Sequence, residues 1–197
     1  MFLETIKIEN SVIKNITFHQ ERFDETRACF FPNSQKIDLA IFFQNLPIVD
    51  TKKIYKLRLL YDFSIYFYEI QPYQPKIIQS LKIIHANSLH YAHKYAQRDE
   101  LNQLFQKKEL CDDVLIVQNN QITDTTYANI AFFDGEKWIT PKNCLLKGTF
   151  RKFLLTQKFI HEQIIFEKDI FQYKKAKIFN SMLEWEASEI EIKNIIC

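Results

Sequence analysis

Residues 90–102 read His-Tyr-Ala-His-Lys-Tyr-Ala-Gln-Arg-Asp-Glu-Leu-Asn, and the rest of the chain is organised around them. They follow a run of apolar, strand-like segments, and they place one lysine, Lys94, among aromatic and histidine neighbours. Such surroundings disfavour the charged amine, and a neutral amine can form a Schiff base with an aldehyde. We interpret Lys94 as the covalent anchor of an aldehyde cofactor. The alternative is a solvated lysine at the start of a helix.

The composition describes a folded chain without a marked charge. Its 197 residues include 18 Phe and 9 Tyr, and 47% of them are hydrophobic, which is enough to form a substantial core. The net charge is +2, with basic and acidic residues interspersed, so no footprint for nucleic acid or for an anionic membrane stands out. We therefore expect a small-molecule substrate or a protein partner.

Cysteine and glycine usage narrows the class further. The cysteines are scattered, with no CxxC pair, at Cys29, Cys111, Cys144 and Cys197. This spacing favours reduced thiols and no metal site, and the absence of a leader-like or membrane-spanning segment predicts a cytoplasmic protein. Two glycines, Gly135 and Gly148, cannot form a GxGxxG or Walker-type loop, so nucleotide folds that depend on such loops are excluded.

The first half of the chain reads as strands with two helices. The expected elements are strands over 2–8 and 12–13, a helix capped by Thr17 that ends by Pro32, a helix capped by Ser34, two antiparallel strands between 53 and 68, and a strand over 76–84. The joint between two domains is expected in residues 85–92. We place the domains at 1–86 and 87–197.

The second half predicts hairpins and short helices. The expected elements are a helix beginning at Asp99, strands 113–117 and 121–123 joined by Asn119-Asn120, strands 128–133 and 136–140 joined by Asp134-Gly135, a helix opened by Gly148, a strand over 160–166, a helix over 169–174, and strands over 176–182 and near 190–192. The fold class is α/β (α+β), with a mostly antiparallel sheet in the second half.

Three further features fit a phosphorylated aldehyde cofactor. Arg22 follows His19 by three residues and can present a planar fork to a phosphate, although a surface arginine is the alternative. The helix that follows Gly148 has amino-terminal amides that suit an anion, or it is an ordinary loop-to-helix junction. Asp124 ends a strand and can hold a pyridine nitrogen protonated, or it is a turn aspartate.

These features occur in a definite order along the chain. The ordered motifs are His19-x-x-Arg22-Phe23, Lys94-x-x-x-Arg98, Ile122-Thr123-Asp124-x-x-x-Ala128-Asn129-Ile130 and Leu146-Lys147-Gly148-Thr149-Phe150-Arg151. The set resembles the class IV aminotransferase family, which comprises the fold type IV pyridoxal phosphate enzymes. The likeness covers nearly the whole chain, to Asn180-Ser181-Met182. It implies a small N-terminal α/β domain and a C-terminal domain with a mostly antiparallel sheet or pseudo-barrel and helices.

The resemblance assigns residues to roles around pyridoxal 5'-phosphate. It implies that Lys94 is the Schiff-base lysine and carries the substrate's α proton. It implies that Arg22 binds the phosphate with the backbone amides of Thr149 and Phe150, and that Asn180 or Ser181 completes the phosphate site. Asp124 would take the place of the family's glutamate at the pyridine nitrogen, and Arg58 would contact a substrate carboxylate. The aspartate keeps the charge on a side chain that is one methylene shorter.

The resemblance also implies a homodimer and a choice of reactions. Members of the family usually carry a further segment before the Phe2-Leu3-Glu4 start, so we expect part of the substrate pocket to differ. The compact length and the Lys94-x-x-x-Arg98 spacing favour aminodeoxychorismate lyase, which forms 4-aminobenzoate and pyruvate for folate biosynthesis. A D-amino-acid or branched-chain aminotransferase of amino acid metabolism is the alternative, and a non-catalytic, truncated relative is the second.

Overall fold

The computed structural model describes residues 1–44, 46, 50 and 52–197. The chain forms two compact units. The first contains Met1–Pro75 and His93–Gln97, and the second contains Lys76–Ala92 and Arg98–Cys197. The expected boundary between residues 86 and 87 falls inside the second unit, because the preceding strand Leu81–His85 pairs with a strand of that unit.

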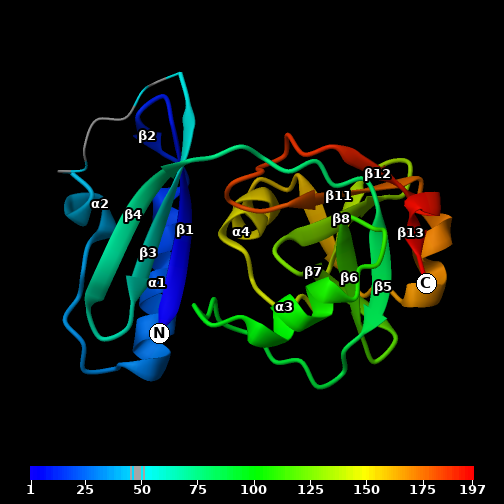
Figure 1. The fold of residues 1–197 in the computed structure, drawn as a ribbon, viewed down its shortest axis with the longest axis horizontal. Coiled ribbons are helices and arrows are strands. Elements are labelled where there is room, and N and C mark those ends of the chain that lie inside the picture. The colour runs from blue at the N-terminus through cyan, green and yellow to red at the C-terminus, as the bar shows by residue number, and fades with distance from the viewer. Residues whose placement is uncertain (45, 47–49, 51) are drawn as a thin grey trace. The chain divides into compact units, whose positions relative to one another are not determined.

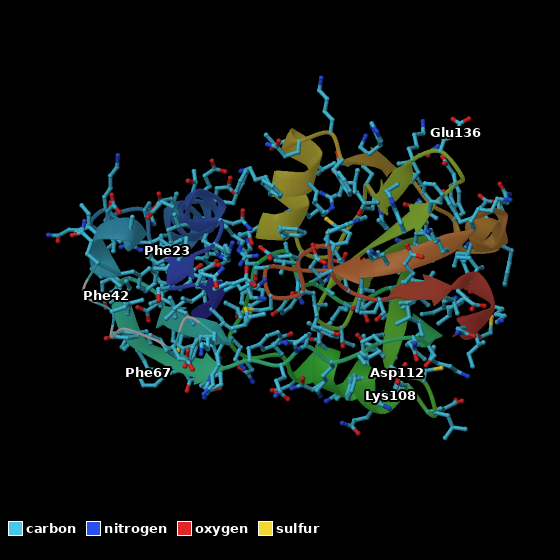
Figure 2. The ribbon with its side chains drawn as sticks, turned by 90° about the horizontal axis from the view of Figure 1, so that it is seen from above. Phe23, Phe42, Phe67, Lys108, Asp112 and Glu136 are labelled. Carbon is cyan, nitrogen blue, oxygen red and sulfur yellow. The ribbon has the colours of Figure 1, made fainter. Side chains whose placement is uncertain are left out.

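The first unit is an antiparallel sheet covered by a helix. Its strands lie in the order β2-β1-β3-β4, with bounds Val12–Ile13 (β2), Phe2–Glu9 (β1), Ile54–Tyr61 (β3) and Ile65–Pro72 (β4). The helix α1, Ile16–Phe30, packs on β1 (Figure 1). Figure 2 labels Phe23 of α1, whose side chain is fully buried in the core beneath the helix. The predicted strands and the first helix of this unit are confirmed, except that β4 ends at Pro72 and not at residue 68.

The two helix caps expected in the first unit are wrong. Asn15, not Thr17, precedes α1, and it adopts a left-handed backbone with φ of 52°. The second helix, α2, spans Leu39–Phe42, and its cap is Asp38, whose side chain accepts a hydrogen bond from the Ile41 amide at 2.9 Å. Short polar side chains compete for such positions, so sequence order alone did not identify the cap.

The second unit contains two sheets. One has the order β13-β5-β6-β7, with bounds Ile195–Ile196, Leu81–His85, Asp113–Gln118 and Gln121–Thr125. The other has the order β10-β9-β8-β11-β12, with bounds Ile160–Gln163, Trp138–Pro141, Asn129–Phe133, Lys175–Phe179 and Glu189–Glu191. Most pairs are antiparallel, but β13–β5, β5–β6 and β10–β9 are parallel. A shared apolar cluster that includes Leu115 and Phe132 forms the core.

Helices and tight turns complete the second unit (Figure 1). The helix α3 spans Asp99–Gln106, α4 spans Thr149–Thr156, and two short 3-10 helices cover Glu167–Gln172 and Ile192–Asn194. Both predicted hairpin turns are confirmed. Asn119 and Asn120 have φ of 49° and 61°, and Gly135 has φ of 119°, the left-handed values that these residue types tolerate.

Three predicted strands in the second unit are too long. The strand expected over 76–84 begins at Leu81, because Asp112, labelled in Figure 2, accepts hydrogen bonds from the Gln79 and Ser80 amides at 2.8 and 3.0 Å. Those over 160–166 and 176–182 end at 163 and 179. In the described part of the chain, no helix has the length and apolar character needed to cross a membrane.

Candidate active site

Lys94 lies against the first strand of the sequence. The Leu3 amide donates to the Lys94 carbonyl at 2.9 Å, and the Ala96 amide donates to the Met1 carbonyl at 3.2 Å. The rings of Phe2 and Tyr95 lie 5.3 Å apart between centroids. The segment His93–Gln97 is therefore held along the start of β1, and the half-buried Lys94 is fixed by a partner that is far away in the sequence.

A buried acid lies beside this contact. Glu4, the residue after Leu3, is 0% exposed. Arg22 of α1 donates two hydrogen bonds to its carboxylate, from Nε to Oε1 at 2.8 Å and from Nη2 to Oε2 at 2.5 Å. His19, also 0% exposed, places Nδ1 2.6 Å from the same Oε2. Because His19 and Arg22 are three residues apart, both project from one face of α1 onto the carboxylate.

The electrostatics of this cluster fix its charges. Burial alone would raise the pKa of Glu4, but the Arg22 guanidinium and the hydrogen bond from His19 outweigh it and lower the pKa to about 2. Burial lowers the pKa of His19 below its ordinary value, against the pull of Glu4. At neutral pH the cluster therefore holds an ionised Glu4, a charged Arg22 and a neutral His19 that donates through Nδ1.

Glu4 was missing from the site residues predicted from the sequence. The available signal was its place in the strand: Glu4 lies on the same face of β1 as Phe2, Ile6 and Ile8, so an acid falls on an apolar face. A buried acid needs a partner, and Arg22 provides it. The structure thus brings Arg22 and Lys94 to the same end of β1 through Glu4 and Leu3.

Arg58 has a partner of its own in the first unit. On β3 it stands opposite Glu69 of β4, and its Nη1 donates to Glu69 Oε1. Both side chains are partly exposed. The structure therefore places Arg58 in a cross-strand ion pair, and its role toward a substrate carboxylate stays a prediction.

Asp124 and Asn129 form the centre of a second cluster, in the second unit. Asp124 on β7 is 4% exposed, and its Oδ1 accepts from Asn129 Nδ2 at 2.8 Å. Its Oδ2 accepts from the Leu146 amide at 2.9 Å, and Asn129 Nδ2 also donates to the Leu146 carbonyl at 2.9 Å. These donors to the carboxyl group are all neutral. Asn129 belonged to a predicted motif, but no role was assigned to it.

Burial dominates the electrostatics of Asp124. It raises the pKa of this carboxyl to about 6, against the hydrogen bonds from Leu146 and Asn129 and the more distant charge of Arg151. Arg151 itself donates hydrogen bonds to the Pro141 carbonyl at 2.8 Å and to Glu162 Oε1 at 2.6 Å. A cationic N–H group that approached Asp124 would stabilise its ionised form, so this acid fits a protonated ring nitrogen.

The start of α4 suits an anion. Gly148 is the residue before the helix, and Thr149 and Phe150, both buried, supply the first backbone amides of its eight residues. The first amides of a helix have no partner within it, and the helix dipole favours negative charge there. Leu146, which is bonded to Asp124, lies two residues before Gly148, so the acid and the helix start are parts of one local structure.

Asn180 and Arg98 hold the backbone near Asp124. Asn180, directly after β11, donates to the Tyr127 carbonyl at 3.2 Å and accepts from the Met182 and Leu183 amides at 2.8 and 2.9 Å. Arg98 donates to the Thr126 carbonyl at 2.5 Å. Both bonds end in the segment between β7 and β8, so the turn that follows Asp124 is held from two sides. Ser181 follows Asn180 in the same turn.

Comparison with known proteins identifies the family. The profile described as amino-transferase class IV matches residues 1–190, nearly the whole chain. The chain belongs to the class IV aminotransferase family. Its members use pyridoxal phosphate, and this chain is accordingly a pyridoxal-phosphate-dependent enzyme with the type IV fold.

Individual relatives agree with this membership. A protein of uncharacterised function from Haemophilus influenzae is 33% identical to this class IV chain over 180 residues, which cover 91% of this chain and 96% of the relative. A crystal structure from Haemophilus somnus 129PT, named provisionally as a 4-amino-4-deoxychorismate lyase, is 34% identical with a TM-score of 0.87 and covers 92% of this chain and 95% of that one.

A more distant structure shares the fold. A hypothetical aminotransferase from Mycobacterium tuberculosis, solved in its pyridoxal-phosphate-bound form, is 13% identical with a TM-score of 0.77. The match covers 99% of this chain and 80% of that one. At this identity the likeness concerns the fold alone.

Proposed function

We propose that this class IV enzyme is a 4-amino-4-deoxychorismate lyase that forms 4-aminobenzoate and pyruvate, a step that supplies folate biosynthesis. The observation that carries the proposal is the likeness to the Haemophilus somnus structure, which has that provisional name, is 34% identical and matches over nearly the full length of both chains. We also propose that the enzyme works as a cytoplasmic homodimer.

We assign the cofactor contacts to the residues of the two clusters. Lys94 is the point of covalent attachment, Arg22 and the amides of Thr149 and Phe150 bind the phosphate, and Asp124 meets the ring nitrogen. Asn180 and Ser181 complete the phosphate contacts. When bound, pyridoxal phosphate withdraws electrons from the α carbon of the amino substrate.

The residues of the chain then have distinct tasks. Lys94 takes the α proton of the substrate, and the pyruvate that leaves receives this proton. The Lys94 backbone therefore has to be held still, which the bond from Leu3 achieves. Glu4 holds the Arg22 fork through Nε and Nη2, which orients the guanidinium plane. Asp124 supplies a carboxylate that is buried, and a buried charge acts strongly on a ring N–H.

Amino-group transfer is the alternative reaction for the same residues. A lyase releases pyruvate and needs no second substrate, whereas a transaminase must accept a 2-oxo acid in the same pocket. We propose that Arg58 contacts a substrate carboxylate in either case, and this requires it to exchange Glu69 for the substrate.

The test begins with the cofactor and continues with the products. The purified enzyme is incubated with pyridoxal phosphate and reduced with borohydride, and its peptides are mapped by mass spectrometry. Attachment at Lys94, its loss in Lys94→Ala and its retention in the exposed control Lys107→Ala are the expected results. If no lysine is modified, the chain is a non-catalytic relative.

The holoenzyme is then supplied with 4-amino-4-deoxychorismate, and pyruvate and 4-aminobenzoate are measured. Equal formation of both products, without any added 2-oxo acid, is the expected result. Turnover that occurs only with a D- or branched-chain amino acid and a 2-oxo acid would replace the lyase assignment by an aminotransferase. Light scattering on the same sample measures the mass, which is expected to be twice that of the 23.7 kDa chain.

A further inference from the structure

Asn129 connects two segments that the proposed function assigns to the cofactor. It is the first residue of β8, 5% exposed, and its Nδ2 donates both to Asp124 and to the Leu146 carbonyl. The Leu146 amide completes a closed ring by donating to the second oxygen of Asp124. A single amide group therefore orients the carboxyl of Asp124 and also holds the chain two residues before Gly148.

Gly148 shows how tightly this amide is enclosed. Its backbone, with φ of −63° and ψ of 144°, is open to any residue type, so the conformation does not require glycine. A Cβ at this position would instead lie 2.1 Å from Asn129 Oδ1, which is shorter than real Cβ contacts, and 3.3 Å from Asn129 Cγ, which is tight. A side chain at Gly148 would therefore force the Asn129 side chain to move.

We propose that Asn129 is a positioning residue of the cofactor site, which sets the spacing between the Asp124 carboxyl and the first amides of α4. The inference rests on the proposed function, because it takes Asp124 and the start of α4 as cofactor contacts. Asn129 itself touches neither the cofactor nor the reacting atoms in this scheme. Its effect passes through Asp124 and through Leu146.

The proposal has an electrostatic consequence that a purely structural asparagine would lack. Asp124 is buried, and it interacts electrostatically with Arg151 of α4 and with Cys144 of the loop before α4. Asn129→Asp places a second carboxyl within hydrogen-bond distance of the first. Two such groups share a proton, so Asp124 would stay protonated to a higher pH and meet the ring nitrogen less well.

The experiment measures the dissociation constant of pyridoxal phosphate by absorbance titration across a pH series. Asn129→Asp is expected to raise this constant at least about tenfold at neutral pH, and to shift its pH dependence upward. The matched control is Asn143→Asp, the same change at an exposed residue of the adjoining loop, whose Nδ2 bonds Gln121 instead. The control is expected to bind and titrate like the wild type.

A second comparison changes Gly148 instead, and it keeps the test decisive if Asn129→Asp fails to fold. Gly148→Ala is expected to weaken binding because its methyl group displaces the Asn129 amide, and the same change made in an Asn129→Ala background is expected to cost much less. Thermal melting of each apoenzyme identifies variants that have lost the fold. The Gly148→Ala pair decides the question if Asn129→Asp is unfolded.

The possible outcomes separate the inference from the proposed function. If the wild type is trapped at Lys94 while Asn129→Asp binds the cofactor like the wild type at every pH, the positioning role is refuted and the function stands. An equal cost of Gly148→Ala with and without Asn129 refutes the role as well. If the wild type shows no attachment at Lys94, the proposed site and the inference are overturned together.

Discussion

Glu4→Gln removes one charge from the centre of the first unit while it preserves the side-chain shape. A buried carboxyl whose pKa falls from its ordinary 4.5 to about 2 contributes about 3 kcal/mol to the free energy of unfolding at neutral pH. Removing one partner of a buried ion pair typically costs about 3–5 kcal/mol. We therefore expect the variant to lose about 3 kcal/mol or more, measured by urea unfolding followed by circular dichroism.

The pH dependence of this loss gives a second check. Because the pKa of Glu4 is depressed in the folded state, its contribution is complete above about 4.5 and disappears as the pH falls toward about 2. The difference between the wild type and Glu4→Gln should narrow over that range. The matched control is Glu69→Gln, which breaks the partly exposed pair with Arg58 and should cost at most about 1 kcal/mol. Equal losses for the two variants would refute the assignment of Glu4 as the buried anchor of Arg22.

Three further predictions concern the acid of the second unit and the packing. Asp124→Asn should weaken pyridoxal phosphate binding. The wild-type apoenzyme should lose stability as the pH rises from 3.8 to about 6, because the raised pKa of the folded state disfavours ionisation, and the variant should not. Equal pH profiles of stability for the two apoenzymes would contradict this. Phe23→Ala should cost about 3–5 kcal/mol in urea unfolding, and a loss below about 1 kcal/mol would exclude Phe23 from the core. Asp112→Ala should speed hydrogen exchange of the Gln79 and Ser80 amides, and unchanged protection would show that these amides do not bond Asp112.

The parts of the fold that were predicted from the sequence depend on neighbouring residues. The turns at Asn119-Asn120 and Asp134-Gly135 were recognisable because these residue types tolerate positive φ between two apolar runs. The start of β5 was missed because it is set by Asp112, which lies more than thirty residues further along the chain. Apolar residues recur from Ile77 to Ile84, and such a pattern cannot show where a distant carboxylate binds the backbone amides.

The candidate site shows the same limit. The sequence supplied Lys94, Arg22 and Asp124 through ordered motifs, but it placed Lys94 in the second domain, whereas the structure joins its segment to β1. That pairing involves only a few residues, and they have no alternating pattern that would predict a strand. Glu4 and Asn129 were not recognised as site residues because their importance lies in what they hold, and these contacts form only in the folded chain.

The two buried acids differ in a way that separates a structural charge from a ligand-facing one. Glu4 is bonded by a cation within its own cluster, and its pKa is pulled down to about 2, so its charge is already compensated. Asp124 is bonded by neutral donors, and its pKa is raised to about 6, so its ionisation is disfavoured until a cation arrives. A chain that needed only stability would gain from an uncharged residue at this position. The cost of keeping Asp124 is explained if a cationic ring N–H from the cofactor supplies the missing charge.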